Sequence, residues 1–197
     1  MSSVQAVILA GGKGSRLHPY TKVLPKPLVP LDDFPIAEII VRQLKFYGLK
    51  NIVISTGHLA ELIETYFGDG RRWGVCIRYV HEDKPLGTAG ALKLINQLAD
   101  DFLVINGDTL TNINFEKLIT FHRSKGAMAT IVVKERIVKT DFGVIECDKK
   151  NMFLDYIEKP EHRSFVSTGI NVFNKKGQNH IKQNESLGMP ELMLRLK

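Results

Sequence analysis

The strongest constraint on the fold is a regular alternation of short apolar runs with segments that have helical spacing. Continuous apolar runs of strand length occupy residues 4–10, 51–56, 75–80, 101–107 and 127–135. Apolar residues with helical spacing lie between them, at 36–47, 59–67, 88–99 and 115–126. Strands buried on both faces appear as continuous apolar runs, and strands that alternate with helices form parallel sheets. The sequence therefore predicts an α/β fold, a Rossmann-like mixed but mostly parallel sheet with helices on both faces.

The pattern changes after Lys134. Three short strand-like segments, 142–148, 153–159 and 165–173, are separated by turns and predict a β-rich half. A further helix is predicted at 189–197. A chain of 197 residues suits one well-packed domain. We therefore expect a single domain over residues 1–197, and we expect it to lack its C-terminal end.

The charge and the apolar runs limit the classes of partner. A formal net charge of +6 favours anionic partners, although a solvated basic surface would give the same total. No stripe of Arg and Lys with interleaved aromatic residues is present, so nucleic acid is not expected. No apolar run approaches the roughly 20 residues of a membrane-spanning helix, and the N-terminus lacks a basic n-region. We expect no membrane association and a cytoplasmic location.

Cysteine and histidine usage gives no sign of a metal site. Cys76 and Cys147 lie in apolar, strand-like segments without C-x-x-C spacing, so we expect two reduced thiols in the core. The six histidines are scattered and form no H-E-x-x-H pattern. Zinc is therefore not expected.

The segment from Leu9 to Pro27 combines three glycines and four cationic side chains with no carboxylate. It matches neither of the two common phosphate loops. The pattern G-x-x-x-x-G-K-[ST] is absent, and the dinucleotide pattern G-x-G-x-x-G fails because Leu17 stands in place of its third glycine. The failed dinucleotide pattern disfavours an NAD-dependent oxidoreductase.

The same segment nevertheless has the parts that a transferred phosphate needs. Glycines let backbone N–H groups approach an anion, and Arg16 supplies a forked donor. Lys26 is held between Pro25 and Pro27, which can aim it at a phosphate on which charge develops. The alternative is a proline-rich surface loop with solvated lysines, but that leaves the lack of acidic residues unexplained.

Three notable stretches directly follow predicted strands: Gly11–Arg16, Glu82–Thr88 and Gly107–Asp108. Ligands of open α/β sheets bind outside the carboxyl ends of the strands. We therefore expect these stretches to meet at one edge of the sheet and to form a single site.

Taken in order, the motifs resemble those of one family. The matching segments are LAGGKGSRL (9–17), PKP (25–27), PLGTAGAL (85–92), NGD (106–108), FGVIE (142–146), EKP (158–160) and STGINVF (167–173). The pattern is similar to that of the sugar-1-phosphate nucleotidylyltransferases, also called NDP-sugar pyrophosphorylases, and within them to mannose-1-phosphate guanylyltransferase-like proteins. The resemblance implies the nucleotide-diphospho-sugar transferase type of fold, with a β-rich sugar-binding half.

The resemblance also implies a reaction. In this family an oxygen of a sugar 1-phosphate attacks the α-phosphorus of an NTP and pyrophosphate leaves, with Mg²⁺ as cofactor and no covalent enzyme intermediate. The implied partners are an NTP, with GTP favoured, and mannose 1-phosphate or a related hexose or heptose 1-phosphate. Homo-oligomerisation is left open.

Roles for single residues follow from the same resemblance. Arg16 and Lys26 are the expected catalytic residues, and Asp108 is the expected Mg²⁺ ligand. The expected nucleotide-binding residues are Leu9, Gly11, Gly12, Gly14, Ser15, Glu82, Gly87 and Thr88. The expected sugar-phosphate-binding residues are Gly143, Glu158, Lys159 and Thr168. Asp108 could instead cap a turn, and Glu158 and Lys159 could be a surface pair.

Glu82 carries the expectation about the base. Uridylyl- and thymidylyltransferases of the family typically have glutamine five residues before the glycine of PLGT, which is Gly87 here. A carboxylate only accepts hydrogen bonds, and guanine offers two adjacent donors, N1–H and the N2 amine. Uracil and thymine offer one donor flanked by acceptors. Glu82 therefore favours GTP, unless its side chain simply faces solvent.

One departure from the family pattern leaves alternatives open. The family usually has a second metal-binding aspartate in a W-x-D-x-G-type segment, and no aspartate follows Lys175 here. We expect that aspartate to lie beyond Lys197. The alternatives are a non-catalytic nucleotide-sugar-binding or regulatory module, and a uridylyl- or thymidylyltransferase of the same family. A glycosyltransferase is disfavoured because Asp108 is followed by Thr109-Leu110 and not by an Asp-x-Asp motif.

Overall fold

The computed structural model describes residues 4–197, which form two compact units. The larger unit comprises residues 4–131 and 169–197, and the smaller unit comprises residues 132–168. No helix among the residues described is both long enough and apolar enough to cross a bilayer.

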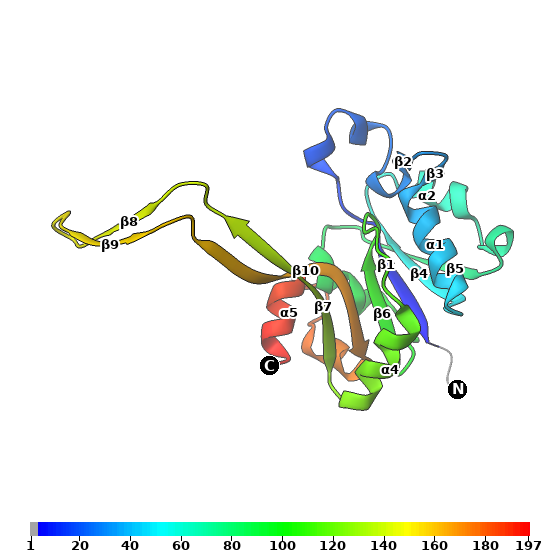
Figure 1. Cartoon of the computed structure of the whole chain (residues 1–197). Helices are drawn as coiled ribbons and strands as arrows, with labels where there is room; N and C mark the ends of the chain where they lie inside the picture. The colour runs from blue at the N-terminus through cyan, green and yellow to red at the C-terminus, as the bar shows by residue number, and fades with distance from the viewer. Residues whose placement is uncertain (1–3) are drawn as a thin grey trace. The chain divides into compact units, whose positions relative to one another are not determined.

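A six-stranded sheet in the order β5-β4-β1-β6-β10-β7 organises the larger unit, and its strands β7 and β10 continue into the residues of the smaller unit (Figure 1). Its strands are β1 (Gln5–Leu9), β4 (Asn51–Thr56), β5 (Cys76–His81), β6 (Asp101–Asn106), β7 (Ala129–Lys139) and β10 (Glu161–Asn174). The first four in sequence order run parallel, and β10 runs antiparallel to β6. In the register of the sheet, Val7 pairs with Val53 on one side and with Val104 on the other. The predicted mixed, mostly parallel sheet is confirmed.

The two faces of this sheet are covered by different helices. Val7, Val53 and Val104 share one cluster with Ala89 of α3 (Gly87–Gly90) and Leu192 of α5 (Met189–Arg195). Successive strand residues point to opposite faces, so Ala6 and Ile8 point away from that cluster. The remaining helices bury apolar stripes that do not belong to it: α1 (Ile36–Phe46), α2 (Ala60–Phe67) and α4 (Phe115–Lys125). They cover the second face.

Helix α1 illustrates why the sequence folds locally as predicted. Ile40 and Leu44 are fully buried and lie four residues apart, so they share one face of the helix. Pro35 stands before the first turn, where its missing N–H has no intrahelical partner to lose. Gly48 adopts φ 79°, the left-handed conformation that ends many helices.

The predicted helix at 88–99 is wrong in length. Only the four residues of α3 are α-helical, and the 3-10 segment Ala91–Leu94 follows. The carbonyl oxygen of Leu187 accepts hydrogen bonds from the N–H groups of Ala89 and Gly90, at 3.0 and 3.1 Å. The first N–H groups of a helix have no intrahelical partner, and here a distant segment satisfies two of them. That contact fixes a short turn where local spacing alone predicted a regular helix.

The expectation that the two cysteines lie in the core is also wrong, although both are free thiols. Cys76 and Cys147 are exposed. Cys76 begins β5, which is an edge strand of the sheet. Cys147 ends β8 (Val144–Cys147), which among residues 4–197 pairs with β9 (Phe153–Ile157) alone. An apolar run indicates a strand, but it does not show whether another layer covers that strand.

The smaller unit is β-rich, as predicted. Strands β8 and β9 form an antiparallel two-stranded sheet with an irregular register between Glu146 and Cys147. Every residue of β9 is exposed.

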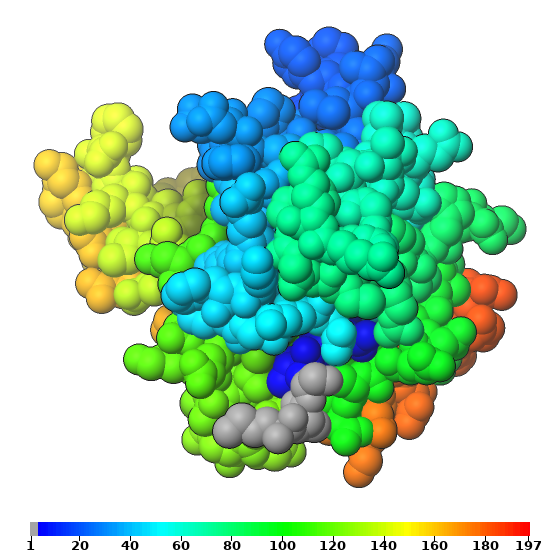
Figure 2. All heavy atoms as spheres, turned by 90° about the vertical axis from the view of Figure 1, so that its right-hand side faces the viewer, coloured from blue at the N-terminus to red at the C-terminus, as the bar shows by residue number. Residues whose placement is uncertain are grey.

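A second two-stranded sheet, of β2 (Pro30–Leu31) and β3 (Phe34–Pro35), belongs to the larger unit. Figure 2 shows the segment that follows β1, in blue, projecting at one end of the larger unit, where Tyr20 and Val23 are exposed.

Candidate active site

A pocket of about 330 Å³ lies in the larger unit, where β1, β5 and β6 end. The three stretches that were expected to meet, after each of these strands, all contribute to it. Its lining residues are Leu9, Ala10, Gly11, Gly12, Gly14, Arg16, Lys26, Pro27, Glu82, Pro85, Gly87, Thr88, Ala91, Asn106, Gly107 and Asp108.

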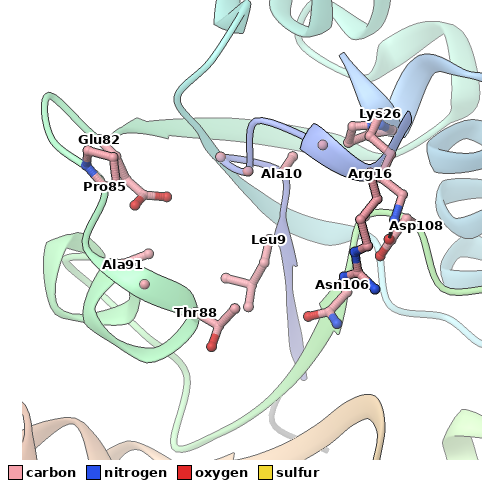
Figure 3. Close-up of a pocket in the computed structure, with 16 residues that line it drawn as sticks. Leu9, Ala10, Arg16, Lys26, Glu82, Pro85, Thr88, Ala91, Asn106 and Asp108 are labelled. Atoms are coloured by element: carbon pink, nitrogen blue, oxygen red, sulfur yellow. Dashed lines mark hydrogen bonds and ion pairs between the residues drawn. The ribbon is translucent and has the colours of Figure 1, made fainter. Parts of the chain in front are cut away.

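The pocket has two chemically different sides (Figure 3). Glu82 and Thr88 lie on one side, together with the apolar Pro85 and Ala91. The charged and amide side chains of Arg16, Lys26, Asn106 and Asp108 gather on the other side. Leu9 and Ala10 at the end of β1 lie between the two groups. A ligand with one flat, polar-edged end and one anionic end would match this division.

The predicted nucleotide-binding, catalytic and metal-binding residues all line this pocket except Ser15, which begins the 3-10 turn Ser15–Leu17. Sequence reasoning assigned no role to Asn106, although it belongs to the NGD motif at the end of β6. The other lining residues without a predicted role are Ala10, Pro27, Pro85, Ala91 and Gly107. They offer apolar surface or backbone, and no side-chain chemistry could have marked them.

The glycine loop is fixed by partly buried hydrogen bonds. Gly14 adopts φ 60°, and a Cβ built there would lie 2.9 Å from Cγ2 of Thr21 and 3.2 Å from Cβ of Lys26. Thr21 is buried, and its hydroxyl donates to the carbonyl oxygen of Gly14 at 3.0 Å. The ring Nε2 of His58 lies 3.0 Å from the carbonyl oxygen of Thr21. The loop therefore has a defined shape that only glycine permits at position 14.

Lys26 and Asp108 form an ion pair across the cationic side, with the ammonium donating to Oδ2. Both side chains keep about a third of their surface exposed, 30% and 31%. Pro27 packs against Gly107, and the N–H of Gly107 donates to the carbonyl oxygen of Leu9 at 2.9 Å. Within residues 4–197, no carboxylate lies within 4 Å of the Arg16 guanidinium. This side of the pocket can therefore attract an anion.

The Glu82 side chain is held in place and does not simply face solvent. Its Oε1 accepts a hydrogen bond from the hydroxyl of Ser55 at 2.9 Å, and its Oε2 accepts one from the N–H of Leu86 at 3.1 Å. Its own N–H donates to the carbonyl oxygen of Thr56 at 2.9 Å. A Cβ at Gly11 would overlap the Glu82 carboxylate, so this carboxylate lies directly against the glycine loop.

A C-terminal segment supports the Gly87–Thr88 part of the pocket, which sequence reasoning missed. The hydroxyl of Thr88 accepts a hydrogen bond from the N–H of Met189 at 2.8 Å. Arg195 binds both carboxylate oxygens of Glu185, at 2.9 and 2.6 Å. Hydrogen bonding to Arg195 lowers the pKa of Glu185 to about 2. The pair joins α5 to the segment just before Leu187, whose backbone contacts α3.

The side chains on the cationic side fit a divalent cation only in part. Among residues 4–197, no three His, Cys, Asp or Glu side chains are arranged to hold a metal ion. Asp108 and Asn106 offer oxygen atoms at the end of β6, on the side that faces Arg16. Mg²⁺ is commonly held by one or two carboxylates together with substrate phosphates. The donor set therefore suits Mg²⁺ that arrives with a phosphate ligand.

The predicted sugar-phosphate residues lie in the smaller unit, and none of them lines the pocket. Lys159 adopts φ 45°, and its ammonium lies 3.9 Å from Oε1 of the exposed Glu158. A Cβ at Gly143 would overlap the ring and hydroxyl of Tyr156. The Thr168 hydroxyl donates to the carbonyl oxygen of Val132 at 2.9 Å. Their assignment to the sugar phosphate remains a prediction.

Comparisons with known proteins agree with these motifs. Residues 5–193 match the family described as Nucleotidyl transferase. The UTP–glucose-1-phosphate uridylyltransferase of Synechocystis is 38% identical over 183 residues, which is 85% of this chain and 47% of that protein. The mannose-1-phosphate guanylyltransferase of Mycobacterium tuberculosis is 32% identical over 193 residues, which is 94% of this chain and 53% of that protein.

A solved structure is similar as well. HddC from Yersinia pseudotuberculosis, complexed with GMP-PN, superposes with a TM-score of 0.70 at 25% identity, covering 95% of this chain and 83% of that one. The chain spans about half the length of the two curated relatives. The family match, the fold and the glycine loop at the strand ends lead to one conclusion: the chain belongs to the nucleotidyl transferase family.

Proposed function

We propose that this chain carries the catalytic pocket of a sugar-1-phosphate nucleotidylyltransferase, which joins an NTP and a sugar 1-phosphate to give an NDP-sugar and pyrophosphate. The observation that carries the proposal is the pocket itself. It gathers a glycine loop, two cations and a fixed carboxylate from segments far apart in the sequence. The family match supports the same activity.

The cationic side would bind the phosphates. Backbone N–H groups of Gly11, Gly12 and Gly14 and the Arg16 guanidinium would hold the triphosphate and stabilise the departing pyrophosphate. Lys26 would lie at the α-phosphorus, where negative charge develops as the sugar-phosphate oxygen attacks. To do so its ammonium has to exchange Asp108 for the phosphate.

Asp108, with Asn106 beside it, would hold Mg²⁺. When bound, Mg²⁺ supplies positive charge to the triphosphate. The residues of the chain would still perform the orientation, because Arg16 and Lys26 approach from the loop while Asp108 approaches from the end of β6.

The smaller unit would bind the sugar 1-phosphate. The ammonium of the exposed Lys159 would bind the phosphate, and the neighbouring Glu158 carboxylate would accept hydrogen bonds from sugar hydroxyls. Gly143 and Thr168 would complete this set. Mannose 1-phosphate, or a related hexose or heptose 1-phosphate, is the substrate that the motif pattern favours.

GTP is the preferred nucleotide in this proposal. The relatives act on different bases, since one is named a uridylyltransferase and another a guanylyltransferase, so they do not decide the question. The support comes from Glu82, whose carboxylate is fixed beside the pocket and offers only acceptors. The two adjacent donors of guanine match such a carboxylate.

A pyrophosphate-release assay tests the proposal. Four NTPs are each combined with several sugar 1-phosphates in the presence of Mg²⁺, and the chain is compared with its Lys26→Ala and Arg16→Ala variants. We expect each variant to lower kcat about 100-fold or more, which is typical of removing a group that stabilises transition-state charge. Lys22→Ala is the matched control, because Lys22 is an exposed lysine of the same loop that does not line the pocket. Near-normal turnover in both pocket variants would contradict the proposal.

A second candidate is a nucleotide-binding module without turnover. It is favoured by the cationic side of the pocket, because, of the two carboxylates that line the pocket, Glu82 lies on the other side and Asp108 is already paired with Lys26. Such a module would bind NTP in a calorimetric titration and release no pyrophosphate with any sugar 1-phosphate.

A further inference from the structure

The Glu82 carboxylate is held by two donors of different chemical kinds. Its Oε1 accepts from the Ser55 hydroxyl at 2.9 Å, and its Oε2 accepts from the backbone N–H of Leu86 at 3.1 Å. A backbone N–H can only donate, whereas a hydroxyl can either donate or accept. Ser55 is therefore the one partner of the two whose hydrogen-bonding role can change.

Ser55 itself has a fixed position. It is fully buried at the end of β4, next to Leu9 in the sheet, and its carbonyl oxygen accepts from the N–H of Ala10 at 2.8 Å. The Glu82 carboxylate also lies against Gly11, where a Cβ would overlap it. Each carboxylate oxygen has two lone pairs and uses one in the bonds described, so each keeps one for a ligand.

These contacts make the outcome of a glutamine at position 82 predictable. The Leu86 N–H needs an acceptor, so the amide oxygen must face it. The amide nitrogen then faces Ser55, whose hydroxyl can turn to accept. The side chain would present one acceptor and one donor to the pocket, which matches the N3–H and carbonyl edge of uracil. A glutamate in the same place presents two acceptors, which match N1–H and the N2 amine of guanine.

We propose that Ser55 is the positioning residue for base selection: its reversible hydroxyl fixes which hydrogen-bonding edge residue 82 shows to the base. The inference rests on the proposed function in one respect, that the base lies beside Glu82. It adds a residue outside the pocket lining, and it predicts that the base preference can be exchanged by a single amide substitution only while Ser55 is present.

The neighbouring Thr56 provides a matched control. Its hydroxyl is also buried at the end of β4, but it donates to Oε1 of Glu64 at 3.3 Å and has no contact with the Glu82 side chain. Thr56→Val replaces a buried hydroxyl with a methyl group of similar size and leaves the hydrogen bonds of the Glu82 side chain intact. Ser55→Ala removes the hydroxyl that holds Glu82.

The experiment measures dissociation constants by titration calorimetry in the presence of Mg²⁺, with GDP, UDP and base-free pyrophosphate as ligands. The proteins are the unmodified chain, Ser55→Ala, Glu82→Gln, the double variant and Thr56→Val, and thermal melting checks that each is folded. We expect Glu82→Gln to move the GDP-to-UDP affinity ratio about tenfold or more toward UDP, as hydrogen-bond mismatches do. Ser55→Ala should lower the ratio about threefold to tenfold in the Glu82 background, because one of the two hydrogen bonds that orient the carboxylate toward the base is lost.

In the double variant the gain for UDP should be largely lost, because the orientation that the Leu86 N–H favours would leave the amide nitrogen facing the alanine at position 55 without an acceptor, and this cost opposes that orientation. Pyrophosphate affinity should change less than about twofold in every variant, since phosphate contacts are independent of the base edge. Thr56→Val should leave the ratio unchanged. The inference is overturned if Ser55→Ala behaves like Thr56→Val, or if Glu82→Gln has the same effect with and without Ser55.

The inference and the proposed function can fail separately. Binding of GDP and UDP that responds to Ser55, together with no pyrophosphate release from any substrate pair, would contradict the catalytic function and support the inference. Nucleotide binding whose ratio ignores Ser55 would contradict the inference alone. If neither GDP nor UDP binds more tightly than pyrophosphate, the base does not lie beside Glu82, and the inference fails together with the proposed preference for GTP.

Discussion

The two units differ in how they hold the side chains that matter for function. In the larger unit, pocket groups are fixed by partners that are themselves buried, as Ser55 fixes Glu82 and Thr21 fixes the loop at Gly14. In the smaller unit, Phe153 and Leu154 follow each other along β9 and are 64% and 61% exposed, so both faces of this two-stranded sheet are open.

The difference shows which of the two predicted groups of binding residues is held in a fixed position before a substrate arrives. An isolated two-stranded sheet is marginally stable, because neither face buries apolar surface against another layer. The residues predicted to bind the sugar phosphate, such as Glu158 and Lys159, are exposed and held only by each other among the contacts described. We expect nucleotide selection to depend on a preformed pocket, and sugar selection to depend on side chains that become ordered with the substrate.

The largest expected effect is on stability and tests the contrast directly. Phe102 is buried at 1% exposure and stacks on Phe173 with ring centroids 5.8 Å apart. Phe102→Ala should lower the free energy of unfolding by about 3–5 kcal/mol, as removing a buried aromatic ring does. The matched change Phe153→Ala in β9 should cost less than about 1 kcal/mol, as exposed substitutions do. Urea unfolding measures both, and equal losses would mean that the smaller unit has a core of its own.

The next effect concerns the glycine loop. Gly14→Ala places a Cβ in a left-handed conformation and 2.9 Å from Thr21 Cγ2, so we expect a loss of about 1–3 kcal/mol in stability. Turnover should fall as well, because the same Cβ presses on Lys26. Gly12→Ala is the control, since a Cβ there meets nothing within 4 Å. Thermal melting compares the two variants, and the pyrophosphate assay compares Gly14→Ala with the unmodified chain; similar melting temperatures of the two variants would show that the loop is not fixed as described.

A smaller effect is expected at the segment that supports Gly87 and Thr88. Arg195→Ala leaves Glu185 without its two-point partner, and the NTP KM should rise about threefold to tenfold while kcat changes little, as loss of ground-state binding does. Arg71→Ala is the control, because Arg71 pairs with the exposed Asp69 outside the pocket.

The ion pair of Glu185 and Arg195 also makes the stability of the fold depend on pH. Because the pKa of Glu185 is lowered from 4.5 to about 2, the contribution of the pair to stability is present above pH 4.5 and is lost as the pH falls toward 2. Arg195→Ala should remove this part of the acid sensitivity. For the prediction on nucleotide binding, an unchanged KM for the NTP in Arg195→Ala would show that the C-terminal segment does not support the pocket.

The smallest expected effect lies at His122, which is buried and contacts the Thr130 hydroxyl at 2.8 Å through Nδ1. Burial lowers the pKa of His122 below 6.5, and the nearby Asp101 opposes this shift. The unfolded chain therefore binds a proton more readily, so stability should fall as the pH drops below 6.5, by at most about 1.4 kcal/mol per pH unit. In His122→Gln the free energy of unfolding, measured by urea titrations between pH 5 and 7, should change less with pH. An unchanged slope would mean that other groups cause the pH dependence.

Much of the larger unit could be predicted because its signals are local. The parallel strands end in glycine or polar motifs, and the sheet then brings those motifs to one edge. The helix at 88–99 could not be predicted correctly, because Leu187 contacts α3 from a distant part of the chain. The exposure of Cys76 and Cys147 was missed for a related reason: a strand pattern does not reveal its neighbours in the sheet.

The candidate site was predictable in location and not in its supporting contacts. The motifs predict the charged side chains that line the pocket, namely those of Arg16, Lys26, Glu82 and Asp108. Ser55 has no such signal, since a serine at a strand end is common, and its role depends on the side chain that folding places opposite it. The pairing of Lys26 with Asp108 likewise joins residues 82 positions apart.

The most direct test of the central claim is a crystal structure of this chain with a non-hydrolysable GTP analogue and Mg²⁺. The account predicts the guanine N1–H and N2 amine within about 3.2 Å of the Glu82 carboxylate, the ordinary limit of a hydrogen bond. It also predicts the triphosphate on the loop from Gly11 to Arg16, with Lys26 turned from Asp108 toward the α-phosphate. A base bound on the side of Arg16 and Asn106, with the phosphates away from the glycine loop, would contradict it.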